Sequence, residues 1–144
     1  DNVEHRLNHA KKSNGAEVYN FSKEDNIGKL LHESTRGGAD VVIDCVGMDG
    51  QIAQDDLEIS SNSAQRGNIS PIITAAESVR KFGTIQLTGI YGTPADNFPI
   101  DLIFNRDVQV KSGQAPVIHM MPNLYDMIKI KSLIQQKLSL ILCL

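Results

Sequence analysis

The stretch that decides the fold is Gly37-Gly38-Ala39-Asp40-Val41-Val42-Ile43-Asp44-Cys45-Val46-Gly47. A glycine pair precedes a run of mostly β-branched apolar residues, and a glycine turn follows it. A run with no polar face until its last residues is typical of a strand buried on both faces of a parallel sheet. In such sheets ligands bind beyond the carboxyl ends of the strands, where Asp44 to Gly47 are expected to lie.

The residues before this stretch predict two helices and one strand. Residues 3–14 have a helical pattern, with Asn14-Gly15 as a left-handed stop. Residues 17–21 alternate polar and apolar side chains, which favours a short strand. Ser22 is the expected N-cap of an amphipathic helix over residues 23–34, which the glycine pair ends.

The residues after the stretch continue the alternation of helices and strands. Ser70-Pro71 predicts a helix start and Gly83 its end, with serine as the N-cap and proline in the first turn. Further elements are expected as strands at 84–88 and 107–111, a short helix at 100–104, and a last helix beginning at Pro122. This order predicts an α/β fold with a parallel sheet and helices on both faces.

Composition limits the classes of function that are open to the chain. The 144 residues are 41% hydrophobic and 22% charged, which is ordinary for a single globular domain. The net charge of -3 gives no basic face, so nucleic acid is not an expected partner. No apolar run is long enough to span a bilayer, so a membrane is not expected either. The two cysteines, Cys45 and Cys143, have no CxxC partner, which fits a reducing cytoplasm.

Three segments resemble the zinc-dependent medium-chain alcohol dehydrogenases. Residues 1–11 resemble the segment after the second strand of their cofactor domain, residues 37–47 their fourth strand, and residues 81–85 the lead-in to their fifth. The long polar stretch at 48–69, together with Ser112-Gly113-Gln114-Ala115-Pro116-Val117, is most similar to the formaldehyde-dehydrogenase branch. The resemblance implies a partial NAD-binding Rossmann domain over residues 1–132, with 48–69 as a long surface loop.

Several parts of that family have no match in this sequence. The Rossmann motif G-x-G-x-x-G and the zinc ligands of the amino-terminal domain do not occur. Residues 133–144 depart from the family's pattern and are expected to form a divergent tail. The chain is therefore expected to be a later part of a dehydrogenase, lacking the first two strands of the sheet. Residues 17–21 should then pair with strand 39–45, or a second chain should fill the gap.

The resemblance implies cofactor-binding residues but no catalytic or metal-ligating ones. Asp1 matches the family's ribose-binding acid, which selects NAD over NADP, and Arg6 would stack on adenine. The remaining candidates lie in turns at the predicted carboxyl ends of strands: Cys45, Val46, Gly47, Gly89, Ile90, Tyr91, Ser112, Gly113 and Gln114. Glycine in such turns lets the backbone approach a ligand closely. The alternatives are a frayed terminal residue, a solvated helix charge and tight turns without a ligand.

Other reactive side chains have simpler interpretations. Cys45 could be a nucleophile, but a buried and inert thiol is the expected state because no cation or helix start is predicted beside it. His5 and His9 share a helix face at a spacing that can bind a metal, but no carboxylate or cysteine completes a site. We therefore expect an exposed helix face there.

The resemblance implies NAD-dependent oxidation of an alcohol, or of formaldehyde as its hydrate, with zinc in the parent protein's other domain. The chain alone is expected to be inactive. A truncated, non-catalytic subunit that dimerises or binds a nucleotide weakly is the alternative. In the family the last strand joins two subunits, so strand 107–111 could form a homodimer. It could equally be an exposed edge guarded by Asp107 and Lys111. A flavodoxin-like module is disfavoured, because no glycine-rich loop follows residues 17–21.

Overall fold

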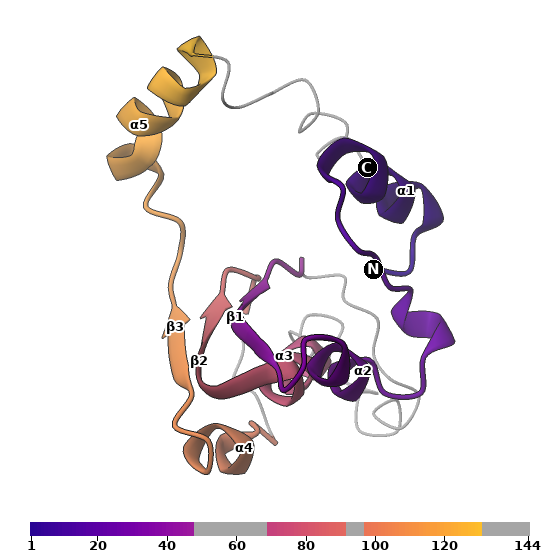
Figure 1. Cartoon of the computed structure of the whole chain (residues 1–144). Helices are drawn as coiled ribbons and strands as arrows, with labels where there is room; N and C mark the ends of the chain where they lie inside the picture. The colour runs from indigo at the N-terminus through magenta and orange to yellow at the C-terminus, as the bar shows by residue number, and fades with distance from the viewer. Residues whose placement is uncertain (48–68, 92–96, 131–144) are drawn as a thin grey trace, which may run out of the picture. The chain divides into compact units, whose positions relative to one another are not determined.

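The computed structural model describes residues 1–47, 69–91 and 97–130. Their elements are, in chain order, α1 (Glu4–Asn14), η1 (Phe21–Lys23), α2 (Ile27–Ser34), β1 (Ala39–Asp44), α3 (Ser70–Ser78), β2 (Val79–Leu87), α4 (Ile100–Phe104), β3 (Gln109–Ser112) and α5 (Val117–Lys129) (Figure 1). They fall into two compact units, one of residues 26–114 and one of residues 1–25 with 115–144. The predicted tail at 133–144 and nearly all of the loop at 48–69 lie outside the described residues. None of the described helices is long and apolar enough to cross a membrane.

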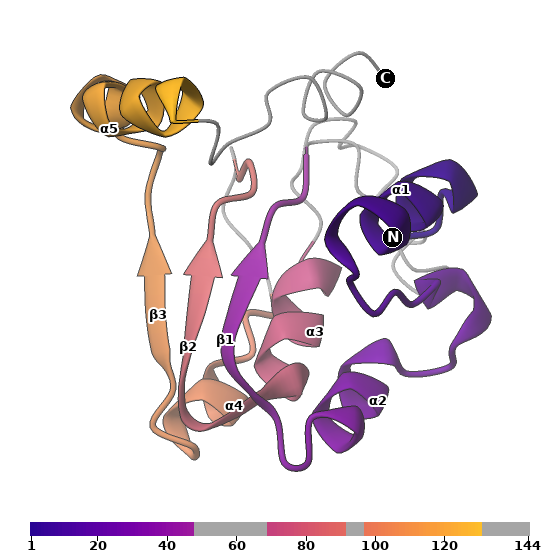
Figure 2. The same ribbon diagram turned by 45° about the horizontal axis from the view of Figure 1, so that its top comes forward.

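The unit of residues 26–114 contains a parallel sheet in the order β1-β2-β3 (Figure 2). The register places Val42 beside Ile85 and Ile85 beside Val110. The predicted strands at 39–45, 84–88 and 107–111 are thus confirmed as parallel neighbours, although β2 begins earlier and β3 later than expected. The three parallel strands flanked by helices confirm the predicted α/β class.

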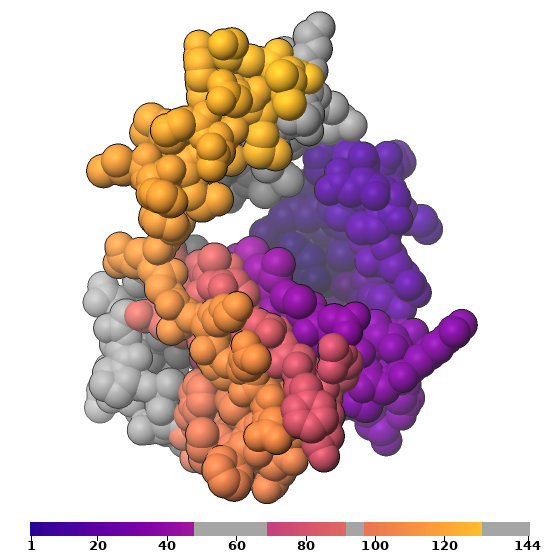
Figure 3. Space-filling model, turned by 60° about the vertical axis from the view of Figure 1, so that its left-hand side comes forward, coloured from indigo at the N-terminus to yellow at the C-terminus, as the bar shows by residue number. Residues whose placement is uncertain are grey.

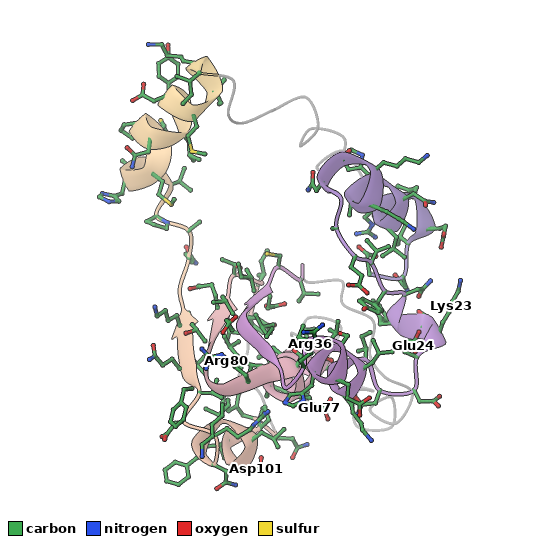
Figure 4. The ribbon with its side chains drawn as sticks, viewed as in Figure 1. Lys23, Glu24, Arg36, Glu77, Arg80 and Asp101 are labelled. Atoms are coloured by element: carbon green, nitrogen blue, oxygen red, sulfur yellow. The ribbon has the colours of Figure 1, made fainter. Side chains whose placement is uncertain are left out.

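Helix α3 packs against the sheet and forms the core. The buried core residues lie on α3, β2 and the segment from α4 to β3: Ala75, Ala76, Val79, Ile85, Ile103 and Val108, with Val42 of β1 packed against them. Helix α2 lies against α3, and Glu77 of α3 is near it (Figure 4). A Cβ on Gly28 would lie 2.3 Å from Glu77 Oε2, so glycine lets the two helices approach closely.

Strand β1 is covered on one face only. Val42 packs on the core, whereas Val41 is 55% exposed and Ile43 is 62% exposed. The prediction of burial on both faces is therefore wrong. Among the described residues β1 pairs with β2 alone, and a strand buried on both faces needs a layer on each side.

The predicted strand at 17–21 is absent. Residues 15–20 have no regular structure, and Phe21–Lys23 form a 3₁₀ turn in which Asn20 accepts a bond from the Ser22 N–H. The expected pairing with β1 is also wrong, because the sheet contains only β1, β2 and β3 among the described residues. An alternating pattern forms a strand only where a neighbour completes its hydrogen bonds.

Helix α2 begins later than the sequence pattern predicted. Its N-cap is Asn26, whose Oδ1 accepts a bond of 2.7 Å from the Lys29 N–H. Ser22 is therefore not the N-cap, and the acidic pair Glu24 and Asp25 lies before the helix. Asparagine and serine are both good caps, so the sequence contained two competing starts.

Helix α3 ends earlier than predicted, and a bulge follows it. The helix stops at Ser78 instead of Gly83, and Ile69 is the N-cap, with Ser70 as the first helical residue. The register moves from Ala39 beside Val79 to Val41 beside Thr84, so residues 80–83 bulge out of β2. Phe82 has a positive φ of 61° at the bulge.

The bulge is held by an ion pair and a close backbone approach. Arg80 Nε donates to Asp40 Oδ1 at 2.5 Å (Figure 4 labels Arg80). A Cβ on Gly83 would lie 2.6 Å from Val79 Cγ2 and 2.9 Å from the Arg80 carbonyl oxygen. Gly83 thus serves the bulge, and not a helix terminus.

Of the three remaining described helices, α1, α4 and α5, only α5 differs from its prediction. Helix α1 ends as predicted, with Gly15 at φ 65° and its N–H donating to the Lys11 carbonyl, and α4 spans the predicted 100–104. The last helix starts at Val117 with Pro116 as its N-cap, so Pro122 lies inside the helix instead of starting it. All residues of α5 are exposed.

Candidate functional site

The predicted site lies at the carboxyl edge of the sheet. Asp44, Leu87 and Ser112 are neighbours in the register, and each stands at the end of its strand. The strands are parallel, so the turns that follow leave from the same edge (Figure 2). The structure thereby brings together three of the predicted groups, residues 45–47, 89–91 and 112–114.

Asp44 connects two of these turns through its side chain. The residue is only 8% exposed. Its Oδ1 accepts a bond of 3.1 Å from the Val46 N–H, and its Oδ2 accepts one of 2.8 Å from the Tyr91 hydroxyl. A buried carboxylate needs such partners, because an ion removed from water without them is costly. Each oxygen of Asp44 is therefore bound to a different turn.

Main-chain bonds extend the pairing of β1 and β2 beyond the strands. The Thr88 N–H donates to the Asp44 carbonyl at 2.9 Å, and the Thr88 hydroxyl donates to the same oxygen at 2.5 Å. The Ile90 N–H donates to the Val46 carbonyl at 3.1 Å. The two turns are thus joined by backbone and side-chain bonds together.

Gly89 is required by the contacts of the Asp44 carboxylate. A Cβ at this position would lie 2.4 Å from Asp44 Oδ2, 2.9 Å from the Val46 carbonyl oxygen and 3.0 Å from Tyr91 Cε2. Two of these atoms, Asp44 Oδ2 and the Val46 carbonyl oxygen, accept hydrogen bonds of the turns. Glycine is therefore needed here for space, and its φ is not in the left-handed region.

Tyr91 is a stable hydrogen-bond donor. Burial, the hydrogen bond to Asp44 and the charge of Asp44, in that order, raise the pKa of the Tyr91 phenol far above its ordinary value. Each cause disfavours the phenolate. The hydroxyl therefore keeps its proton through the neutral range and donates it to the carboxylate.

Cys45 differs from its expected state. The thiol is free and exposed, not buried, and its Sγ lies 3.5 Å from Thr88 Oγ1. Its exposure continues the alternation of β1, in which Val41 and Ile43 are exposed while Val42 and Asp44 are covered. Within residues 1–47, 69–91 and 97–130, no group of three or more His, Cys, Asp or Glu side chains could hold a metal ion.

Open space lies beside two of the predicted glycines. Cβ atoms built on Gly47 and Gly113 would meet nothing within 4 Å, and Gly113 has a φ of 149°. Ser112 and Gln114 are exposed, and the orange residues of β3 lie at the surface (Figure 3). Among the described residues, no side chain or backbone atom crowds the Cα of either glycine.

Asp1 and Arg6 belong to the other compact unit. Asp1 Oδ1 accepts bonds from the N–H groups of Asn2 and Val3 at 2.7 and 3.0 Å, and Asp1 Oδ2 lies 3.6 Å from Arg6 Nε. The Asp1 amino group donates to the Tyr19 carbonyl, and its carbonyl accepts the Phe21 N–H. The role of Asp1 and Arg6 in cofactor binding stays a prediction.

The sequence pattern placed Asp44 at the ligand-binding edge of the sheet but indicated neither Asp44 nor Thr88 as a cofactor-binding residue. A carboxylate that ends an otherwise apolar strand was a usable signal, since such a group needs a buried partner. Its partner Tyr91 follows the next strand along the sheet, and strand pairing would have brought the two together.

No family model matches the chain. The chain is 46% identical over 128 residues to the uncharacterized zinc-type alcohol dehydrogenase-like protein AdhB of Bacillus subtilis (strain 168). That match covers 89% of the chain and 34% of the relative, so the chain spans about a third of its length.

Solved dehydrogenases have a similar fold. The alcohol dehydrogenase TADH from Thermus sp. ATN1 matches with a TM-score of 0.61 and 23% identity, over 88% of this chain and 31% of that one. The 2R,3R-butanediol dehydrogenase from Bacillus subtilis matches with a TM-score of 0.61 and 20% identity, over 87% and 30%. Benzyl alcohol dehydrogenase from Acinetobacter calcoaceticus matches with a TM-score of 0.61 and 19% identity, over 95% and 32%.

The class that the fold defines is the Rossmann-like α/β fold of the alcohol dehydrogenases. The similarity in sequence is to a zinc-type alcohol dehydrogenase-like protein, and the solved dehydrogenases share the fold of this chain.

Proposed function

We propose that the chain forms part of the cofactor-binding wall of an NAD-dependent, zinc-containing alcohol dehydrogenase. One observation carries the proposal: turns 45–47, 89–91 and 112–114 follow three adjacent parallel strands at one edge of the sheet. Ligands of open α/β sheets bind beyond that edge. The similarity to zinc-type alcohol dehydrogenase-like proteins gives the class of reaction.

The residues of the chain fit one side of a dinucleotide. At Gly47 and Gly113 the backbone carries no side chain, so a flat ring could approach it closely. In the other compact unit, Asp1 is the residue that the family resemblance implies as the acceptor of hydrogen bonds from the ribose hydroxyls. The phosphates would need a glycine-rich loop at a helix N-terminus, and the sequence has no G-x-G-x-x-G match. When bound, NAD accepts a hydride from the substrate.

The substrate that we propose is an alcohol, or formaldehyde as its hydrate. This step rests on the similarity of residues 48–69 and 112–117 to the formaldehyde-dehydrogenase branch. Zinc would belong to another domain of the parent protein, because the described residues hold no group of metal ligands. Such an enzyme would work in the cytoplasm, in agreement with the cysteine usage.

The first experiment is a nucleotide titration of the ¹⁵N-labelled 144-residue chain, followed by NMR. We expect NAD to shift the amide signals of residues 45–47, 89–91 and 112–114. Signals of α5 serve as the internal control. A titration that leaves the three turns unshifted, or that shifts α5 equally, would overturn the proposal.

A second experiment tests catalysis. The isolated chain should produce no NADH from primary alcohols or formaldehyde, with or without added zinc, because its sequence has no match to the phosphate-binding motif G-x-G-x-x-G. Turnover above background from a preparation without full-length enzyme would contradict this expectation.

The second candidate function is a non-catalytic, dimerising subunit. All four residues of β3 are exposed and its outer edge is unpaired among the described residues, which favours it. Two such edges can pair around a twofold axis. Light scattering should then give a dimer mass that Val110→Lys reduces to a monomer. A monomer for the unchanged chain would remove this candidate.

A further inference from the structure

We infer that Asp44 is a positioning residue that fixes the turns after β1 and β2 in the arrangement that binds the nucleotide. Tyr91 is its partner in this role. The inference rests on the proposed function, because it needs a ligand at the carboxyl edge. It assigns different roles to these residues. Turns 45–47 and 89–91 contact the ligand, whereas Asp44 does not contact it and affects binding by holding the two turns in place.

The first argument is the use of both carboxylate oxygens. Oδ1 receives the Val46 N–H and Oδ2 receives the Tyr91 hydroxyl, at 3.1 and 2.8 Å. Bonds to an ionised group are stronger than neutral ones, and Asp44 is 8% exposed, so water competes little for them. Asp44 is thus oriented toward the two turns and has no oxygen without a protein partner.

The second argument is the direction of the backbone groups. The Val46 N–H is taken by Asp44 Oδ1, and the Val46 carbonyl is taken by the Ile90 N–H. The residues flanking Val46, namely Cys45 and Gly47, are exposed. The inner groups of the turn are therefore fixed, while its outer residues face the solvent, where a ligand would lie.

The third argument is the position of Asp44 relative to the core. The core cluster consists of residues from α3, α4, β2 and the approach to β3, whereas Asp44 lies at the last position of β1. Gly89 allows the carboxylate to lie where a Cβ would be 2.4 Å from Oδ2. The residues around Asp44 thus hold the turns, and hydrophobic burial elsewhere holds the domain.

The experiment uses three variants, namely Asp44→Asn, Tyr91→Phe and the double variant that carries both changes. The control variant is Asp40→Asn. Asparagine has one acceptor oxygen and no charge, so it can accept only one of the two bonds and neither is charge-assisted. Asp40 gives a matched control, because it receives the same substitution on the same strand but has an exposed side chain at the other end. The dissociation constant for NAD and the amide spectrum are measured for each chain, and the spectrum verifies that α1, α3 and β2 keep their signals.

We expect Asp44→Asn to weaken NAD binding roughly tenfold and Tyr91→Phe a few-fold, as for the loss of one charge-assisted hydrogen bond. Asp40→Asn should leave the constant unchanged. The double variant should bind NAD no more weakly than Asp44→Asn, because both changes disrupt the same hydrogen bond between Asp44 and Tyr91. The Val46 and Ile90 amides should shift in both single variants before NAD is added.

Two results would overturn the inference in different ways. If NAD binds the unchanged chain and binds Asp44→Asn and Tyr91→Phe equally well, the positioning role is wrong and the proposed function stands. If NAD does not shift the turns of the unchanged chain, the proposed function fails and the positioning role fails with it. Additive losses in the double variant would contradict a shared clamp.

Discussion

Asp40 and Asp44 lie near opposite ends of β1, and their surroundings differ. Asp40 has a side chain that is 81% exposed and pairs with Arg80, itself 43% exposed, at a bulge. Asp44 is 8% exposed and is bonded to the backbone of one turn and the hydroxyl of another. The same residue type on one strand thus forms a surface ion pair at the amino end and a buried clamp at the carboxyl end.

This difference indicates which end of β1 depends on a specific side-chain interaction. An exposed ion pair contributes little, because water screens it and the side chains lose freedom. A buried carboxylate is retained only if its partners offset the cost of desolvation. The carboxyl end of β1 is therefore the end that should respond to substitution.

The largest effect is expected for Gly89→Ala, with Gly47→Ala as the control. The new Cβ would lie 2.4 Å from Asp44 Oδ2 and 2.9 Å from the Val46 carbonyl oxygen. Overpacking of this kind should lower the free energy of unfolding by about 3 kcal/mol. A Cβ added at Gly47 would meet nothing within 4 Å, so Gly47→Ala should leave the free energy of unfolding unchanged. Urea denaturation measures both; equal midpoints would contradict the contact.

The next effect is the loss of stability in Asp44→Asn. Both hydrogen bonds lose their charge assistance and only one can still be accepted by the side chain, so unfolding should become easier by about 2 kcal/mol. Asp40→Asn removes an exposed pair and should change the free energy by less than about 0.5 kcal/mol. If denaturation curves gave the same loss of unfolding free energy for both variants, the burial of Asp44 would not make it more important for stability than the exposed Asp40.

A smaller effect is expected from the ionisation of Tyr91. Its pKa is raised by burial and by Asp44, so its contribution to stability is complete below the unfolded pKa of about 10 and is lost as the pH rises through the folded value. The ultraviolet titration of the chain minus that of Tyr91→Phe should therefore show no tyrosinate near pH 10. A full Tyr91 transition at that pH would contradict the bond to Asp44.

The sequence predicted the elements that local pattern decides. The strand at 39–45, the helix stop at Gly15 and the short helix at 100–104 follow from periodicity and turn chemistry, and the structure contains all three. The parallel order of the sheet followed from the alternation of elements. These features depend on neighbours in the chain, so one sequence suffices for them.

The errors arose where a distant neighbour or a competing signal decides. Residues 17–21 alternate like a strand but lack a sheet partner among the described residues. Asn26 competed with Ser22, and Pro116 with Pro122, for a helix start. Cys45 lies just beyond the end of its strand, so an apolar run predicted burial where the structure has an exposed thiol.

The sequence predicted where the turns of the candidate site lie on the sheet but not the contacts between them, and their role in binding stays a prediction. The three glycine-containing turns lie at one edge, as the order of the strands implied. The bond between Asp44 and Tyr91 joins residues 47 positions apart. Neither residue carries a local signal for the other, so only the strand pairing reveals the clamp.

The most direct test of the cofactor wall is the alkylation rate of Cys45 in a Cys143→Ser chain. The Cys45 thiol is exposed in the turn after β1, so a thiol reagent should modify it in the folded protein. The account predicts that NAD slows this modification in a concentration-dependent way, and that glucose does not. An alkylation rate unaffected by NAD at every concentration, in a chain whose thiol reacts freely, would contradict a nucleotide at this edge.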